Sequence, residues 1–252
     1  MKTSILIIDF GSQVTKLIAR RVRELGVFSF LIPYDKLKTD FFKKNNIKGI
    51  IFSGGPSSVE AKNSPMVPDF VYNQKIPILG ICYGLQLICK KFGGTVRSSN
   101  DREFGKKYIS IKKNSPLIDS IYFLKKKYQV WMSHGDSIEK IPMEFEFIAS
   151  SDNCRSAIIQ NIKKKIFGVQ FHPEVIHTLQ GDKILKNFII KICECRASWN
   201  MKSFKKEIIP EIKDKVGKKK VICGLSGGVD STVTAILIHR AIGEQLKCVF
   251  VD

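Results

Sequence analysis

Residues 76–92 read IPILGICYGLQLICKKF, and the periodicity of this stretch changes at Cys82. The first six residues form a short apolar run, which favours a buried strand of a parallel sheet. After Cys82 the apolar residues return at helical spacing, and the pair Gly93-Gly94 can end a helix. The sequence therefore places Cys82 where a strand turns sharply into a helix.

Two glycines flank this cysteine. Gly80 and Gly84 lie two residues on either side of Cys82 and give the pattern G-x-C-x-G. This pattern is the cysteine form of the nucleophile elbow, a strained turn that exposes its nucleophile at the carboxyl edge of a sheet. The N-terminus of the helix would favour a thiolate there. The pattern also fits a buried core cysteine, because free cysteines are among the most buried residues.

A base for such a nucleophile occurs in residues 166–174, IFGVQFHPE. An apolar strand leads to His172, and Glu174 follows two residues later. A thiol nucleophile needs an imidazole that takes and returns its proton, and a carboxylate that fixes the imidazole tautomer. A lone histidine at a strand end is often only structural, but the pair of motifs favours catalysis.

A glycine turn in residues 47–58, IKGIIFSGGPSS, supplies a third element. The turn at Gly54 and Gly55 ends another apolar strand, where backbone N–H groups can face a developing oxyanion. The N–H of Tyr83, directly after the nucleophile, would complete this group. Taken alone, the turn also fits an ordinary tight connection.

These segments resemble the class I glutamine amidotransferase domain, through GICYGLQ, SGGP and GVQFHPEV. The segments IIDFGSQVTKLIARRVRELGV, SNDREFG, VWMSHGDSI and HPEVIHTLQG are similar to the glutaminase half of glutamine-hydrolysing GMP synthetases. The resemblance implies that Cys82 is the nucleophile, His172 the acid/base and Glu174 its orienting group. It also implies that the glutamine substrate is held by Gln86 and by a loop formed by Ser133, His134, Gly135 and Asp136.

A second candidate site lies in residues 221–252, VICGLSGGVDSTVTAILIHRAIGEQLKCVFVD. The pattern predicts a strand over 221–225, a helix over 230–242 and a strand over 248–252. A loop that opens a helix with glycines and hydroxyls is typical of a phosphate site, and it lacks the lysine of a Walker A loop. It also fits a simple helix cap. The loop residues are Ser226, Gly227, Gly228, Val229, Asp230, Ser231 and Thr232.

The segment SGGVDS resembles the pyrophosphate loop of N-type ATP pyrophosphatases, which transfer AMP from ATP. This resemblance implies an ATP site with Mg²⁺ at the loop, and no metal held by the protein alone. Together the two resemblances imply that glutamine is hydrolysed to glutamate and ammonia. The ammonia would then aminate adenylated xanthosine monophosphate (XMP) to give GMP.

The order of strands and helices predicts an α/β fold. Apolar strands near 4–8, 27–32, 48–53, 77–81 and 166–171 alternate with helices at 12–25 and 84–92, which indicates a mainly parallel sheet with helices on both faces. Segments 107–111 and 147–159 would add antiparallel strands. We expect a glutaminase domain over 1–197, a connecting helix over 198–220 that contains Pro210, and the incomplete start of an ATP pyrophosphatase domain over 221–252.

The composition argues against a nucleic-acid-binding protein, a membrane protein and a zinc protein. The net charge of +19 comes mostly from scattered lysines without interleaved aromatic residues, so we predict no nucleic-acid partner. No apolar run is long enough to span a bilayer, so we predict no membrane association. Seven cysteines, an odd number, indicate reduced thiols in a cytoplasmic enzyme. Cys193 and Cys195 lack a second Cys/His pair, so they do not predict a zinc site.

The segment 221–252 is too short to bury a core by itself, because one βαβ unit cannot cover both faces of a parallel sheet. GMP synthetases continue beyond this point, and the resemblance implies a homodimer formed through a C-terminal domain that these residues lack. Two other possibilities stay open: a stand-alone cysteine glutaminase or γ-glutamyl hydrolase of the same fold, and a truncated remnant without activity.

Overall fold

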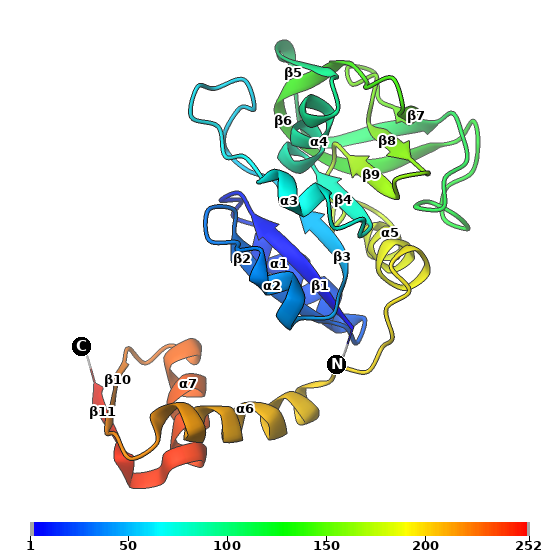
Figure 1. Ribbon diagram of the computed structural model, residues 1–252. Helices are drawn as coiled ribbons and strands as arrows, with labels where there is room; N and C mark the ends of the chain where they lie inside the picture. The colour runs from blue at the N-terminus through cyan, green and yellow to red at the C-terminus, as the bar shows by residue number, and fades with distance from the viewer. Residues whose placement is uncertain (1–2, 251–252) are drawn as a thin grey trace. The chain divides into compact units, whose positions relative to one another are not determined.

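The computed structural model describes residues 3–250, which separate into two compact units (Figure 1). The units are Met1–Ser198 and Trp199–Asp252. The functional boundaries expected at residues 197 and 220 stay predictions. No helix among residues 3–250 is both long enough and apolar enough to cross a membrane.

The first unit is built on a nine-stranded sheet with the order β2-β1-β3-β4-β9-β8-β7-β5-β6. The first five strands in this order are parallel. They are β2 (Phe28–Pro33), β1 (Ser4–Asp9), β3 (Ile47–Phe52), β4 (Ile78–Ile81) and β9 (Ile166–Val169). The remaining four run antiparallel to their neighbours. They are β8 (Ile158–Asn161), β7 (Glu146–Ser150), β5 (Thr95–Ile111) and β6 (Lys127–Lys140).

Helices cover both faces of the parallel part. Ile5 and Ile7 of β1 pack in one apolar cluster with α1 (Thr15–Glu24) and α5 (Gly181–Lys186). Leu6 and Ile8 of the same strand pack in the opposite cluster with α4 (Tyr83–Lys91). The alternation follows from the two-residue period of a strand, since successive side chains point to opposite faces. The predicted fold class is therefore confirmed.

Some elements differ from the sequence expectations. The short helices α2 (Asp40–Lys44) and α3 (Asp69–Tyr72) were not predicted, and a π-helix, η1 (Asn187–Ile192), continues α5. The segment 133–136, expected as a loop, lies inside β6. Its residues pair with β5, for example His134 with Glu103, and a register shift in β5 accommodates them. The sequence did not reveal this strand, because many of its side chains are polar and its stability comes from pairing with β5.

The second unit begins with α6 (Met201–Val216), which contains Pro210. A βαβ unit follows, formed by β10 (Val221–Leu225), α7 (Val229–Ile242), the 3₁₀ turn η2 (Gly243–Gln245) and β11 (Leu246–Phe250). The two strands are parallel neighbours. The last two residues of the strand predicted over 248–252 lie outside the described residues. Large apolar side chains such as Ile222 and Phe250 are 76% and 66% exposed, as expected for a sheet too small to bury a core.

Close packing fixes the position of α4 against β3. The Gly84 N–H donates to the Ser53 carbonyl at 3.1 Å. A Cβ at Gly84 would lie 2.5 Å from the Phe52 carbonyl oxygen and 2.6 Å from the Phe52 Cβ. These are shorter than any normal contact, so only glycine fits where the helix begins.

Gly84→Ala should lower the free energy of unfolding by about 1–3 kcal/mol, because the methyl group meets backbone that cannot move aside. Urea denaturation followed by circular dichroism measures this loss. Gly135→Ala is the matched control, since a Cβ there comes no closer than 3.7 Å to Arg102 Nε. Equal midpoints for the two variants would contradict the packing argument.

Candidate active site

Cys82 occupies a strained turn between β4 and α4. Its φ of 52° and ψ of −106° lie in a region that non-glycine residues rarely adopt. The Cys82 N–H donates to the Val169 carbonyl at 2.8 Å and thereby joins the turn to β9. A Cβ at Gly80 would lie 2.6 Å from the carbonyl group of Gly84, which explains the small residue on each side of the cysteine.

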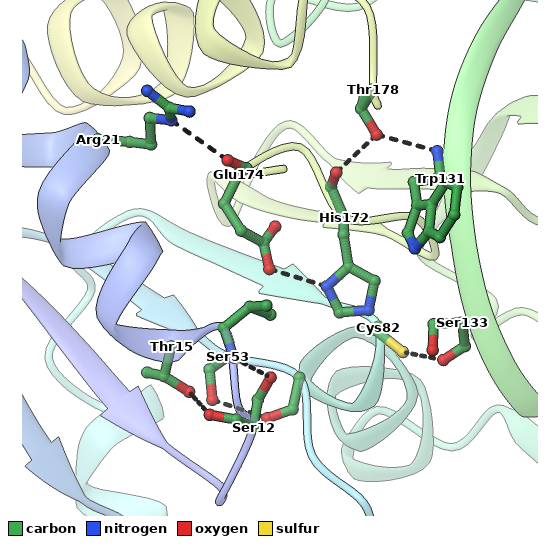
Figure 2. A network of polar contacts seen from close by, with 12 residues as sticks. Ser12, Thr15, Arg21, Ser53, Cys82, Trp131, Ser133, His172, Glu174 and Thr178 are labelled. Atoms are coloured by element: carbon green, nitrogen blue, oxygen red, sulfur yellow. Dashed lines mark hydrogen bonds and ion pairs between the residues drawn. The ribbon is translucent and has the colours of Figure 1, made fainter. Parts of the chain in front are cut away.

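His172 and Glu174 lie beside this cysteine. The His172 Nδ1 and the Glu174 Oε1 are 2.8 Å apart, and Figure 2 shows the imidazole ring between the carboxylate and the Cys82 sulfur. Glu174 is fully buried, and the side chains of His172 and Cys82 reach little solvent. The structure thus brings together the three residues that the sequence predicted as a catalytic group.

The electrostatics of this group favour a charged imidazole. Burial would lower the pKa of His172, but the hydrogen bonds and charges of Cys82 and Glu174 outweigh burial and raise the pKa from 6.5 to about 10. An imidazolium next to a cysteine stabilises the thiolate, which is the nucleophilic form. The arrangement therefore suits nucleophilic catalysis at neutral pH.

Neighbouring residues hold the histidine in place. The Thr178 hydroxyl donates to the His172 carbonyl at 2.6 Å and accepts the Trp131 N–H at 3.0 Å (Figure 2). The His172 N–H donates to the Trp131 carbonyl at 3.0 Å. Arg21 of α1 donates to the Glu174 carbonyl at 3.2 Å. The segment after β9 is therefore fixed to both β6 and α1.

A cavity of about 400 Å³ opens onto the sulfur. Of the predicted site residues, Gly55, Cys82, Ser133 and His172 line it. The other lining residues, which the sequence reasoning missed, are Gly11, Ser12, Gln13, Val14, Pro56, Trp131 and Val175. Residues 11–14 closely follow the end of β1. Because the carboxyl ends of adjacent parallel strands meet at one edge of a sheet, the sequence could have predicted that this loop lies beside Cys82.

The loop after β1 is itself held by polar contacts. The Asp9 carboxylate accepts the Gly11 N–H at 2.9 Å and the Thr15 hydroxyl at 2.8 Å. The Ser53 hydroxyl accepts the Phe10 N–H at 3.1 Å. One wall of the cavity is therefore ordered before any substrate arrives.

Other predicted site residues point elsewhere. The Gln86 amide donates to the Asp136 carbonyl at 3.0 Å, and the His134 ring lies between that carbonyl and Glu103. The Tyr83 hydroxyl donates to the Pro65 carbonyl at 2.6 Å, which leaves only its backbone N–H for an oxyanion. None of these side chains lines the cavity. Their roles in binding stay predictions.

Two further glycines that the sequence predicted as site residues have different neighbours. Gly54 is next to the histidine, since a Cβ there would lie 3.0 Å from His172 Cε1. Gly135 lies beside Arg102 instead, with a Cβ position 3.7 Å from its Nε. Of these two glycines, only Gly54 lies next to His172.

A buried group of Glu103, His134 and Cys154 has ligand atoms within 4.8 Å of one another, so these residues could hold a metal ion. Burial would raise the pKa of Glu103, but hydrogen bonds from His134 and Ser151 lower it below its ordinary value. Burial raises the pKa of the Cys154 thiol to about 12. Because Glu103 and His134 already bond to each other and to Ser151 and Asp136, we interpret the group as a hydrogen-bonded network.

The predicted phosphate loop lies between β10 and α7 and is exposed. Gly227 has a φ of +74°, a conformation that favours glycine. The hydroxyls of Ser231 and Thr232 donate to the Gly228 carbonyl at 3.1 and 2.9 Å and order the first turn of the helix. The loop is open to a ligand, and its N–H groups lie at a helix N-terminus, which suits an anion.

The raised pKa of His172 leads to a prediction for stability. Between pH 6.5 and about 10, the folded state keeps a proton that the unfolded state releases. The stabilisation is therefore complete below pH 6.5 and is lost as the pH rises towards 10. Urea denaturation at several pH values should show this fall in the wild type and a shallower slope in His172→Asn. Parallel profiles would mean that the folded protein binds no extra proton at this site in this pH range.

Comparison with known proteins places this geometry in a family. The family model for class-I glutamine amidotransferases matches residues 6–192, and that for NAD synthase matches residues 201–251. A glutamine-hydrolysing GMP synthase of Agrobacterium fabrum is 51% identical over 249 residues, and one of Zymomonas mobilis is 50% identical over 250 residues. Each alignment covers 99% of this chain and 47% of the relative, so the chain spans about half the length of these relatives.

Solved structures agree. One from Thermoplasma acidophilum, described as that of a GMP synthase subunit, is 31% identical, with a TM-score of 0.69 over 82% of this chain and 98% of its own. A glutamine amidotransferase of Methylobacillus flagellatus shares the fold at 19% identity and a TM-score of 0.56, over 69% of this chain and 71% of its own. With a family match over most of its length and a cysteine, histidine and glutamate in contact at its sheet edge, the chain belongs to the class-I glutamine amidotransferases.

Proposed function

We propose that this chain carries the glutaminase of a glutamine-hydrolysing GMP synthase. The observation that carries the proposal is the buried contact of His172 with Glu174 beside Cys82, where Cys82 and His172 line a cavity of about 400 Å³. The identity of about 50% with GMP synthases supports the choice of this enzyme over other amidotransferases. This identity does not favour the two alternatives, a stand-alone hydrolase or an inactive remnant.

The chemistry follows from the placement of these side chains. The Cys82 thiolate attacks the side-chain amide carbon of glutamine, and the negative charge that develops on oxygen is held by backbone N–H groups near Gly55 and at Tyr83. The His172 imidazolium donates its proton to the departing nitrogen, which leaves as ammonia. The neutral His172 then takes a proton from water, whose oxygen attacks the thioester. The carbon–sulfur bond breaks, which regenerates the Cys82 thiolate and the His172 imidazolium, and the product leaves as glutamate after losing its carboxyl proton to solvent.

The second unit would use this ammonia. We propose that the loop 226–232 binds the phosphates of ATP, since it combines exposed N–H groups with a helix N-terminus and two hydroxyls. Asp230 and the hydroxyls offer the oxygen ligands that Mg²⁺ prefers, and Mg²⁺ would neutralise phosphate charge. ATP would adenylate XMP, and ammonia would displace AMP to form GMP.

The rest of the nucleotide site would come from segments that the longer relatives have and these 252 residues do not contain. We further propose a cytoplasmic enzyme that forms a homodimer through such a segment. The exposed apolar side chains of Ile222 and Phe250 support the need for more protein around β10 and β11.

Cys82→Ala should reduce glutamine hydrolysis to the background rate, because no other group can form the thioester. Glutamate release measures the loss, and circular dichroism checks the fold. Cys89→Ala is the matched control, since Cys89 lies in α4, directly after the turn that holds Cys82, and burial raises its pKa to about 12. Turnover by Cys82→Ala near the wild-type rate would disprove the assignment.

A GMP synthase that contains these residues should form GMP from XMP, Mg-ATP and glutamine, with one glutamate for each GMP. Its Cys82→Ala variant should lose this activity but keep GMP formation from ammonium chloride, because ammonia is the only product that the second site needs. Glutamate and GMP are measured in the same reaction. Loss of both activities at normal stability would contradict the division of labour between the two units.

A further inference from the structure

A buried chain of two carboxamides ends at the catalytic sulfur. The Gln86 Nε2 donates to the Asp136 carbonyl at 3.0 Å and to the Gln170 Oε1 at 3.3 Å. The Gln170 Nε2 lies 3.6 Å from the Cys82 Sγ, which is a normal distance for an N–H donor and a sulfur acceptor. Gln170 is fully buried and Gln86 is 3% exposed, so water does not compete for these groups.

The direction of this chain is fixed by the backbone. A carbonyl oxygen only accepts hydrogen bonds, so the Asp136 carbonyl requires the amide nitrogen of Gln86 to face it. The second hydrogen on that nitrogen then requires the carbonyl oxygen of Gln170. If Gln170 were flipped, two amino groups would face each other. The remaining amino group of Gln170 must therefore point at the sulfur as a donor.

A hydrogen-bond donor with a fixed direction stabilises the thiolate form of Cys82 more than the thiol form. The thiol S–H has an acceptor in the Ser133 carbonyl at 3.5 Å, and this contact gains nothing from a negative sulfur. The Gln170 N–H gains strength when the sulfur is charged, because hydrogen bonds to ionised groups are roughly twice as strong as neutral ones. Gln170 therefore favours the thiolate in addition to the His172 imidazolium.

We propose that Gln170 is a further catalytic residue, which donates its amide N–H to the Cys82 sulfur and stabilises the thiolate. Gln86 is its positioning residue: it bonds to the Asp136 carbonyl and thereby fixes which way the Gln170 amide is oriented. The inference rests on the proposed role of Cys82 as nucleophile. It assigns to Gln86 a part in activating the nucleophile, beyond the substrate contact that the sequence resemblance implied.

The test is the rate of Cys82 alkylation by iodoacetamide as a function of pH, in the absence of glutamine. Gln170→Met keeps the length of the side chain but removes the donor. Its pH midpoint should move up by about one unit, so that alkylation at lower pH is about tenfold slower. Gln86→Met should move the midpoint in the same direction by less, because Gln170 stays but loses its fixed orientation.

Fragment mass spectrometry measures the label at Cys82, and the buried Cys89 nearby serves as an internal reference. Gln160→Met is the matched control: Gln160 is 3% exposed and bonds to Glu146 rather than to the active site. Its midpoint should equal that of the wild type. An unchanged midpoint in folded Gln170→Met overturns the proposal, and if that variant does not fold, an unchanged midpoint in Gln86→Met does so.

The assay separates this inference from the proposed function. If Cys82→Ala abolishes glutamine hydrolysis while Gln170→Met keeps the wild-type midpoint, only the role of Gln170 is wrong. If the midpoint shifts as expected but the wild type does not hydrolyse glutamine, the thiolate contact stands and the proposed substrate is wrong.

Discussion

The backbone conformation of Cys82 is the constraint on which the site depends. A φ of 52° at a non-glycine residue costs about 1–3 kcal/mol and persists only where surrounding contacts hold it. Three contacts do so here: the Cys82 N–H donates to Val169, and the Cys82 carbonyl accepts the N–H groups of Leu85 and Gln86. The folded sheet and the first turn of α4 thus hold Cys82 in the lining of the cavity.

The order of the parallel strands explains why residues far apart in the sequence meet there. In the order β1-β3-β4-β9, each strand ends shortly before a residue that lines the cavity. These residues are Ser12, Gly55, Cys82 and His172. The antiparallel part adds Ser133 and Trp131 from β6, joined to the His172 segment through the Thr178 hydroxyl. The meeting of Cys82 and His172 is therefore a property of the sheet edge rather than of any one loop.

The sequence predicted those elements whose residues form a local pattern along the chain. The elbow at Cys82, the five parallel strands and the βαβ unit around residues 226–232 all show in periodicity and in glycine spacing. The strand β6 did not, because its polar residues are stabilised by pairing with β5. Nor could the sequence tell that Gln86 and His134 turn away from the cavity, since those directions depend on the Asp136 carbonyl and on Glu103.

The two oxygens of the Glu174 carboxylate differ in their hydrogen bonding. Among the described residues, Glu174 Oε2 is buried and has no hydrogen-bond partner, which normally costs free energy. Because the Glu174 carboxylate bonds to His172 through its other oxygen, its charge acts chiefly on the imidazole ring. Burial would lower the pKa of His172, but Cys82 and this carboxylate together raise it, so the imidazolium is the stable form of the ring.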